Sequence, residues 1–176
     1  NTHDTSTVDG VDITPSKFAA AKVTVIEKGV KGDLTAEIGS KSVKLDEAVV
    51  KLPVMVSHDM DFAGFAAFVS KFEATNGAEV VSVSAGSSVN AEDVMASNNG
   101  NKGVWNSANS DDVSFAVNAD GTRDEIFVIE VKLPADRAIG DEYDVVFVEG
   151  SVDIGTHALE DLVAKQINGK ITIVKE

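Results

Sequence analysis

The feature that most constrains the fold is a succession of short strand-forming runs separated by turn signals. Each run is rich in Val, Ile, Phe or Thr and is bounded by Gly, Pro, Asp or Asn residues that favour turns. The runs fall at residues 22–26, 34–38, 49–56, 64–72, 79–84, 112–117, 125–133, 143–148 and 170–174. Turns at intervals of about 8–15 residues are typical of two packed antiparallel sheets. The sequence therefore predicts an all-β fold, an antiparallel β-sandwich of about nine strands and of jelly-roll type.

One segment departs from the strand pattern. Residues 157–165 contain good helix formers, and Thr156 before them is a suitable N-cap. Leu159, Leu162 and Val163 would lie on one face of such a helix. We therefore expect one short helix before the last strand.

Length and charge bound the domain organisation and the partners. The 176 residues suit one domain, with the sandwich expected over 33–176 and the polar segment 1–32 unassigned, as a leader or an extra strand. The formal net charge of −14 argues against a nucleic-acid partner, which requires a basic surface. No apolar run approaches the roughly 20 residues that span a membrane, so no direct membrane insertion is expected. The absence of cysteine excludes disulfides and thiol nucleophiles.

The run at 64–72 is apolar on both faces, whereas a sandwich strand normally alternates apolar inward and polar outward. The same excess occurs at 143–148, where Val146 and Val148 face outward if Tyr143, Val145 and Phe147 face the core. The run at 64–72 can face the core in two phases. In one of them Ala66, Phe68, Ser70 and Phe72 face inward, and Phe65, Ala67, Val69 and Lys71 face outward. The opposite phase exposes Phe68 and Phe72 instead. Either phase leaves apolar residues on the outer face, for a partner or for a cover formed by the leader or the helix.

The order of the runs resembles that of cohesin modules, the receptor domains of cellulosome scaffolds. Gly64-Phe65, the aromatic strand after it and the run at 79–86 are similar to the family's third and fourth strands. Further similar pieces follow the family's order at 34–56, 113–121, 126–134, 140–147 and 168–174. Residues 72–74 read Phe-Glu-Ala where the family has Tyr-Asp-Pro, so the chain resembles a divergent cohesin.

This resemblance implies a non-catalytic protein-binding module of a secreted or cell-surface cellulosome, monomeric before complex formation. Its partner would be the dockerin module of an enzyme or scaffold, and the dockerin rather than this chain would hold calcium. In cohesins the third, sixth and eighth strands are neighbours, and the outer face of their sheet binds the dockerin. The residues expected to contact the partner are Phe65, Ala67, Val69, Lys71, Trp105, Ser114, Ala116, Asn118, Val146 and Val148.

Two other interpretations remain open for particular residues. Trp105 is either an interface aromatic or a core tryptophan, and with Tyr143 it could instead stack on sugars in a carbohydrate-binding module. Only these two of the ten aromatic residues are of the usual stacking types, and this counts against sugar binding. A structural or adhesive spacer is a third possibility.

Catalysis has the weakest support in the sequence. Asp pairs such as Asp141 and Asp144 could be read as calcium ligands or a carboxylate dyad, but residues 118–125 lack the Gly and Glu spacing of an EF-hand loop. His58 and His157 have no partner pattern. We therefore predict no catalytic residue, no metal site and no cofactor in this chain.

Overall fold

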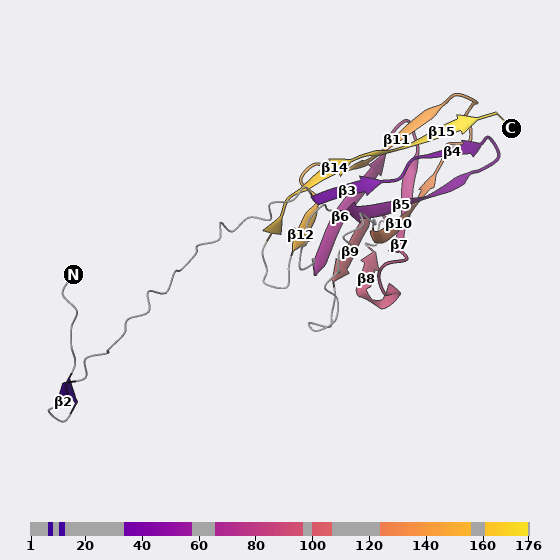
Figure 1. Cartoon of the computed structure of the whole chain (residues 1–176). Coiled ribbons are helices and arrows are strands. Elements are labelled where there is room, and N and C mark those ends of the chain that lie inside the picture. Colours follow the sequence, from indigo (N-terminus) through magenta and orange to yellow (C-terminus); the bar gives the residue numbers. More distant parts are fainter. Residues whose placement is uncertain are drawn as a thin grey trace.

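The protein is a β-sandwich, seen in a computed structural model that describes residues 7–8, 11–12, 34–57, 66–96, 100–106, 124–155 and 161–175. Within these residues the only helical element is a single 3-10 turn, η1 (Ala91–Asp93). Strands β1 (Thr7–Val8) and β2 (Val11–Asp12) pair with each other in a separate two-stranded sheet. The other strands form two larger sheets (Figure 1), so the predicted all-β sandwich is confirmed.

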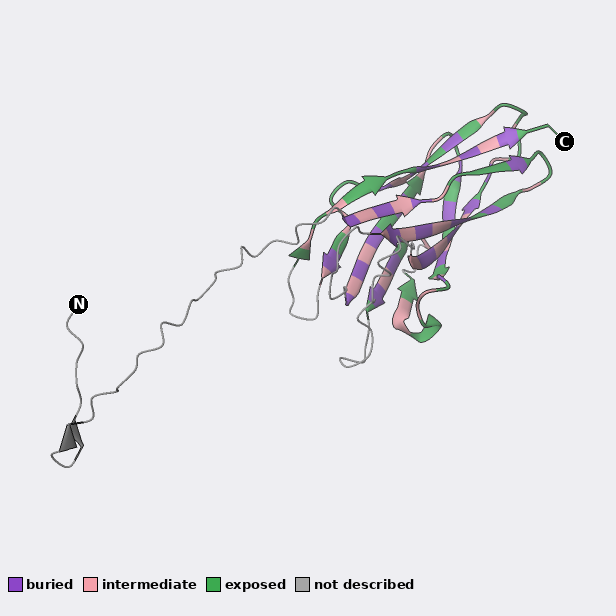
Figure 2. Ribbon diagram, viewed as in Figure 1, coloured by how far each residue is buried: buried purple, intermediate pink, exposed green. Residues whose placement is uncertain are grey.

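The first large sheet has five strands. Their order is β14 (Ala164–Ile167), β3 (Leu34–Ile38), β5 (Val49–Ser57), β10 (Asp124–Lys132) and β7 (Glu79–Ala85). β3, β5, β10 and β7 pair antiparallel, and β14 adds to β3 in parallel. Buried residues alternate with intermediate ones along β3 and with intermediate or exposed ones along β5 (Figure 2), as expected for strands with one face on the core.

The second large sheet has eight strands, and β6 is its hub. Six of its strands follow one another in the order β13 (Asp161–Leu162), β12 (Asp153–Gly155), β6 (Ala67–Ala74), β11 (Glu142–Phe147), β15 (Gly169–Val174) and β4 (Lys41–Lys44). The other two branch from β6: β9 (Lys102–Asn106) pairs with β6, and β8 (Val94–Ala96) pairs with β9. β11 and β12 pair with different parts of β6. Between them the Ser151 hydroxyl accepts from the Lys71 N–H (3.1 Å) and donates to the Lys71 carbonyl (3.2 Å). Ser151 therefore completes the hydrogen bonding of β6 where no strand does.

Two of the points at which the chain crosses between the sheets touch each other. It passes from β3 to β4 at Gly39 and Ser40, and from β14 to β15 at Asn168. A Cβ atom on Gly169 would collide with the carbonyl oxygen of Gly39, so the close approach requires glycine. The Lys170 N–H also donates to the Ser40 hydroxyl at 3.0 Å. These contacts close the sandwich between its first and last strands.

An aromatic cluster joins the two sheets at the centre of the core. Phe127 of β10 stacks on Phe68 of β6 with centroids 5.2 Å apart, and it meets Phe72 edge-on at 6.2 Å. Phe72 also packs against Phe147 of β11 at 5.6 Å. Such pairs add to the free energy gained by burying their area. They fix the inner face of β6 and thereby the orientation of its outer face.

The expected helix at 157–165 is wrong over its described part. Residues 156–160 lie outside the described residues, while Asp161–Leu162 form β13 and Ala164–Ile167 form β14. Leu162 pairs with Ile154, and Val163, predicted on the apolar face of the helix, is 93% exposed. A short isolated helix is marginal, whereas the open edges of β12 and β3 offer this segment backbone partners.

Candidate docking surface

The structure resolves which face of β6 is inward. Phe68, Ser70 and Phe72 are fully buried, while Ala67 and Val69 are partly exposed and Lys71 is exposed. This is the first of the two phases considered for this strand, and the second, which exposed Phe68 and Phe72, is wrong. Phe65 lies outside the described residues.

The orientation expected for β11 is confirmed. Tyr143, Val145 and Phe147 are buried, whereas Val146 and Val148 are partly exposed. Val146 lies opposite Glu73 on the outer face, and the Val148 N–H donates to the Lys71 carbonyl at 2.9 Å. Both valines therefore flank the outer face of β6.

The other neighbour of β6 is a strand outside the strand-forming runs of the sequence, although the resemblance to cohesins implies that a fifth strand ends at Trp105. It is β9, within the polar segment 97–110, whereas the expected neighbour at 112–117 lies outside the described residues, as do Ser114, Ala116 and Asn118. Lys102, Val104 and Asn106 of β9 face outward. Met95 of β8 pairs with Val104 and is 60% exposed.

Trp105 does not lie on this outer face. It pairs with Phe68, is 1% exposed and belongs to the core. Residues of β9 alternate, so the exposure of Val104 places Trp105 inward. The interpretation of Trp105 as an exposed partner contact is corrected to the alternative, a core tryptophan.

Six apolar residues share the outer face of the eight-stranded sheet, and we call them the apolar strip. Its members are Met95, Val104, Val69, Ala67, Val146 and Val148. Met95, Val104 and Val69 lie side by side across three strands, and the same row ends at Asp153 of β12. The row beside it holds Lys102 opposite Lys71. A relatively flat sheet surface with small apolar side chains lets a partner backbone approach closely.

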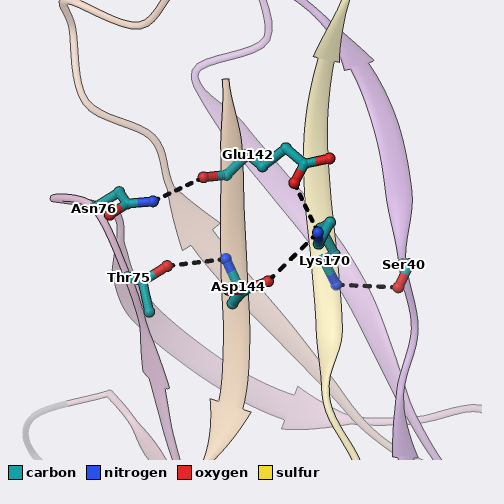
Figure 3. A network of polar contacts seen from close by, with 6 residues as sticks. All are labelled: Ser40, Thr75, Asn76, Glu142, Asp144 and Lys170. Carbon is teal, nitrogen blue, oxygen red and sulfur yellow. Dashed lines mark hydrogen bonds and ion pairs between the residues drawn. The ribbon is translucent and has the colours of Figure 1, made fainter. Parts of the chain in front are cut away.

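The far end of the same outer face is polar and internally bonded (Figure 3). The Lys170 ammonium lies 2.7 Å from a Glu142 carboxylate oxygen and 3.9 Å from Asp144. The hydrogen bond and the charge of Glu142 raise the pKa of Lys170, against a small opposing effect of desolvation, and Asp144 adds to the rise. Thr75 accepts from the Asp144 N–H, and Asn76 donates to the Glu142 carbonyl. Within the described part of the chain these polar groups satisfy one another.

The residues considered for metal ligation and sugar stacking have other roles in the described structure. No group of three or more His, Asp or Glu among the described residues could hold a metal ion. Asp141 is used in a turn, accepting from the Ala138 N–H at 2.7 Å and the Tyr143 hydroxyl at 3.3 Å. Desolvation raises the pKa of Tyr143, with a further contribution from Asp141. Both Trp105 and Tyr143 are buried, so neither ring is available to stack on a sugar.

Comparison with solved structures identifies the architecture. The sixth cohesin of Acetivibrio cellulolyticus scaffoldin B, solved with a Cel5 dockerin, matches with a TM-score of 0.64 at 18% identity over 80% of this chain and 99% of that one. The chain has the cohesin fold. The third cohesin of ScaC from the same organism, solved with the ScaB dockerin, matches with a TM-score of 0.64 at 20% identity, over 81% and 99% of the two chains.

A third neighbour extends the cohesin fold beyond cellulosomes. A non-cellulosomal cohesin from the archaeon Archaeoglobus fulgidus matches with a TM-score of 0.57 at 16% identity, over 81% of this chain and 92% of that one. No protein-family model and no curated protein matches the sequence. In the described part of the chain, no helix is long and apolar enough to cross a membrane.

Proposed function

We propose that this chain is a non-catalytic, cohesin-like receptor that docks a calcium-loaded dockerin module on the apolar strip. The observation that carries the proposal is the row of Met95, Val104 and Val69 across three neighbouring strands of a sandwich with the cohesin fold. Apolar contacts at the centre would supply affinity, and the polar residues around them specificity. The calcium belongs to the dockerin, and the setting is an extracellular multi-enzyme complex, with the cellulosome as its model.

The test is calorimetry of the full chain against a panel of calcium-loaded dockerins, with soluble glycans as parallel ligands. We expect sub-micromolar binding to at least one dockerin and loss of that binding with a chelator. The isolated chain should show no measurable calcium affinity of its own. Binding to glycans with no response to any dockerin would contradict the proposal.

A pair of matched variants locates the interaction. Val69→Asp places a charge in the apolar strip and should weaken dockerin binding at least tenfold, while the melting temperature stays within a few degrees. Val128→Asp makes the same change at a partly exposed valine on the outer face of the five-stranded sheet, and it should leave affinity unchanged. Equal losses from both variants would show that neither face is the specific site.

A further inference from the structure

Two lysines stand directly opposite each other beside the apolar strip. Lys71 of β6 pairs in register with Lys102 of β9, and both side chains are exposed on the outer face. The Lys71 N–H and carbonyl bond to Ser151 and Val148 on the side away from β9. The two lysines therefore occupy a non-hydrogen-bonded position, where opposite Cα atoms lie about 4.5 Å apart and side chains are closest.

Neither ammonium group is neutralised within the described residues. Ion pairs among these residues include those of Lys41, Lys51 and Lys170, and neither Lys71 nor Lys102 takes part in one. Two acidic residues lie on the same face, Glu73 two residues along β6 from Lys71 and Asp153 opposite Val69, and neither pairs with these lysines. Like charges directly opposite across strands are destabilising. The free chain therefore carries a local cost that a bound anion would remove.

The location of the pair favours a carboxylate within a protein interface. Val69 and Val104 form the next row, so docking on the apolar strip would also desolvate the ammonium groups. Charge-assisted hydrogen bonds strengthen as water is excluded. The chain has 15 basic and 29 acidic residues, so two adjacent cations with no ion-pair partner among the described residues stand out against its overall charge.

We propose that Lys71 and Lys102 together bind one Asp or Glu side chain on the docking helix of the partner. The inference rests on the proposed docking function and specifies the partner's chemistry. Successive outward positions on a strand are about 6.6–6.8 Å apart, close to the rise of about 6 Å between residues four apart in a helix. A helix lying along β6 would thus place an apolar residue over Val69 and an acidic residue four positions away over the lysines.

Long-range and local electrostatics then select different features of the partner. The net charge of −14 favours encounter with a partner of net positive charge. That field is screened within about 8 Å at physiological ionic strength, whereas the lysine pair acts at contact. The partner expected is a net basic helical module with an acidic residue at the centre of its contact face.

The test is a displayed library of calcium-loaded dockerins in which the exposed helix positions are randomised. It is selected in parallel against the parent chain, the double variant Lys71→Glu/Lys102→Glu, and the control Lys132→Glu/Lys165→Glu. The control alters two exposed lysines of the five-stranded sheet by the same total charge. The parent and the control should enrich Asp or Glu at one contact position, and the double variant should enrich Lys or Arg there.

Affinities of the selected binders complete the test. Reversal of the lysine pair should weaken binding of parent-selected modules about 100-fold, at roughly tenfold per lysine, and the control should change it little. Suppose that selected binders lose affinity for the Val69→Asp variant but show no enrichment of Asp or Glu at any contact position. That result would overturn the proposed role of the lysine pair and leave the proposed docking surface standing. A library without binders, or binders indifferent to Val69→Asp, would overturn the docking surface and this inference with it.

Discussion

The outer faces of the two sheets each carry a pair of charged residues that lie opposite each other on neighbouring strands, and the two pairs differ in the signs of their charges. On the five-stranded sheet Lys51 pairs in register with Glu130, and their charged atoms are 3.0 Å apart. Hydrogen bonds from Lys51 and Ser82, with the charge of Lys51, lower the pKa of Glu130. On the eight-stranded sheet, Lys71 lies opposite Lys102 in register, so both charges of that pair are positive.

Apolar exposure alone does not separate the two faces. The five-stranded sheet also presents partly exposed Pro53 and Val128 at opposed positions. The difference is that its neighbouring charges neutralise each other, whereas those beside the apolar strip do not. A face that meets only water has no need of an outside group, whereas Lys71 and Lys102 have no ion-pair partner within the described residues. The charge pattern therefore supports the proposed docking face more strongly than hydrophobicity does.

The largest expected effect separates the inner from the outer side of β9. Trp105→Ala would leave a cavity in the core and lower the free energy of unfolding by about 3–5 kcal/mol. Val104→Ala, at the adjacent outward position, should change stability far less and partner affinity more. Urea denaturation of both variants measures the first effect and calorimetry the second. A small stability loss for Trp105→Ala would contradict its placement in the core.

The next effect concerns the crossing that holds the two sheets together. Gly169→Ala introduces a Cβ against the Gly39 carbonyl, which is backbone and cannot rotate away. Accommodating it should lower the free energy of unfolding by about 1–3 kcal/mol. Chemical denaturation should report this loss, and a variant as stable as the parent would show that the crossing is looser than described.

A smaller effect tests the like-charge pair in the free chain. Lys102→Glu places opposite charges across from each other and should raise the free energy of unfolding by about 0.2–1 kcal/mol. Lys51→Glu, on the other sheet, should lower the free energy of unfolding, because the introduced carboxylate would lie opposite the carboxylate of Glu130. Melting curves at low salt measure both. Shifts of the same sign in the two variants would remove the contrast between the faces.

The smallest expected effect is a pH dependence of the stability that arises from Glu130 on the five-stranded sheet. The pKa of Glu130 is lowered from 4.5 in the folded chain, so its stabilising contribution is present above the unfolded value and lost as the pH falls through the folded pKa. The stability difference between the parent and Glu130→Gln should therefore shrink on acidification. Denaturation midpoints of both proteins between pH 7 and pH 3 test this, and a constant difference would refute it.

The sequence predicted strands well where apolar runs were bounded by turn signals. The two-residue period of a strand limited β6 to two possible phases and indicated the inward set of β11, and the structure shows which phase β6 adopts. β8 and β9 did not stand out as strand-forming runs because they have only three and five residues and β9 lies inside an Asn-, Ser- and Gly-rich stretch. β9 is positioned by pairing with β6, and β8 by pairing with β9, which are tertiary effects.

The candidate site was only partly predictable for the same reason. Ala67, Val69, Lys71, Val146 and Val148 face outward as expected, but their role in binding stays a prediction. Met95, Val104 and Lys102 entered the surface only once the β6–β9 register was known. The helix expected at 157–165 failed because local propensity there is weaker than the pairing offered by open strand edges.

The most direct test of the docking face uses the absence of cysteine from the chain. Single-cysteine variants Met95→Cys and Ser84→Cys place one thiol within the apolar strip and one exposed thiol on the outer face of the five-stranded sheet. Alkylation rates are compared with and without a saturating, calcium-loaded dockerin that binds the parent. The account predicts that the dockerin slows alkylation at Met95→Cys and not at Ser84→Cys. Protection of Ser84→Cys alone, or of neither thiol, would contradict it.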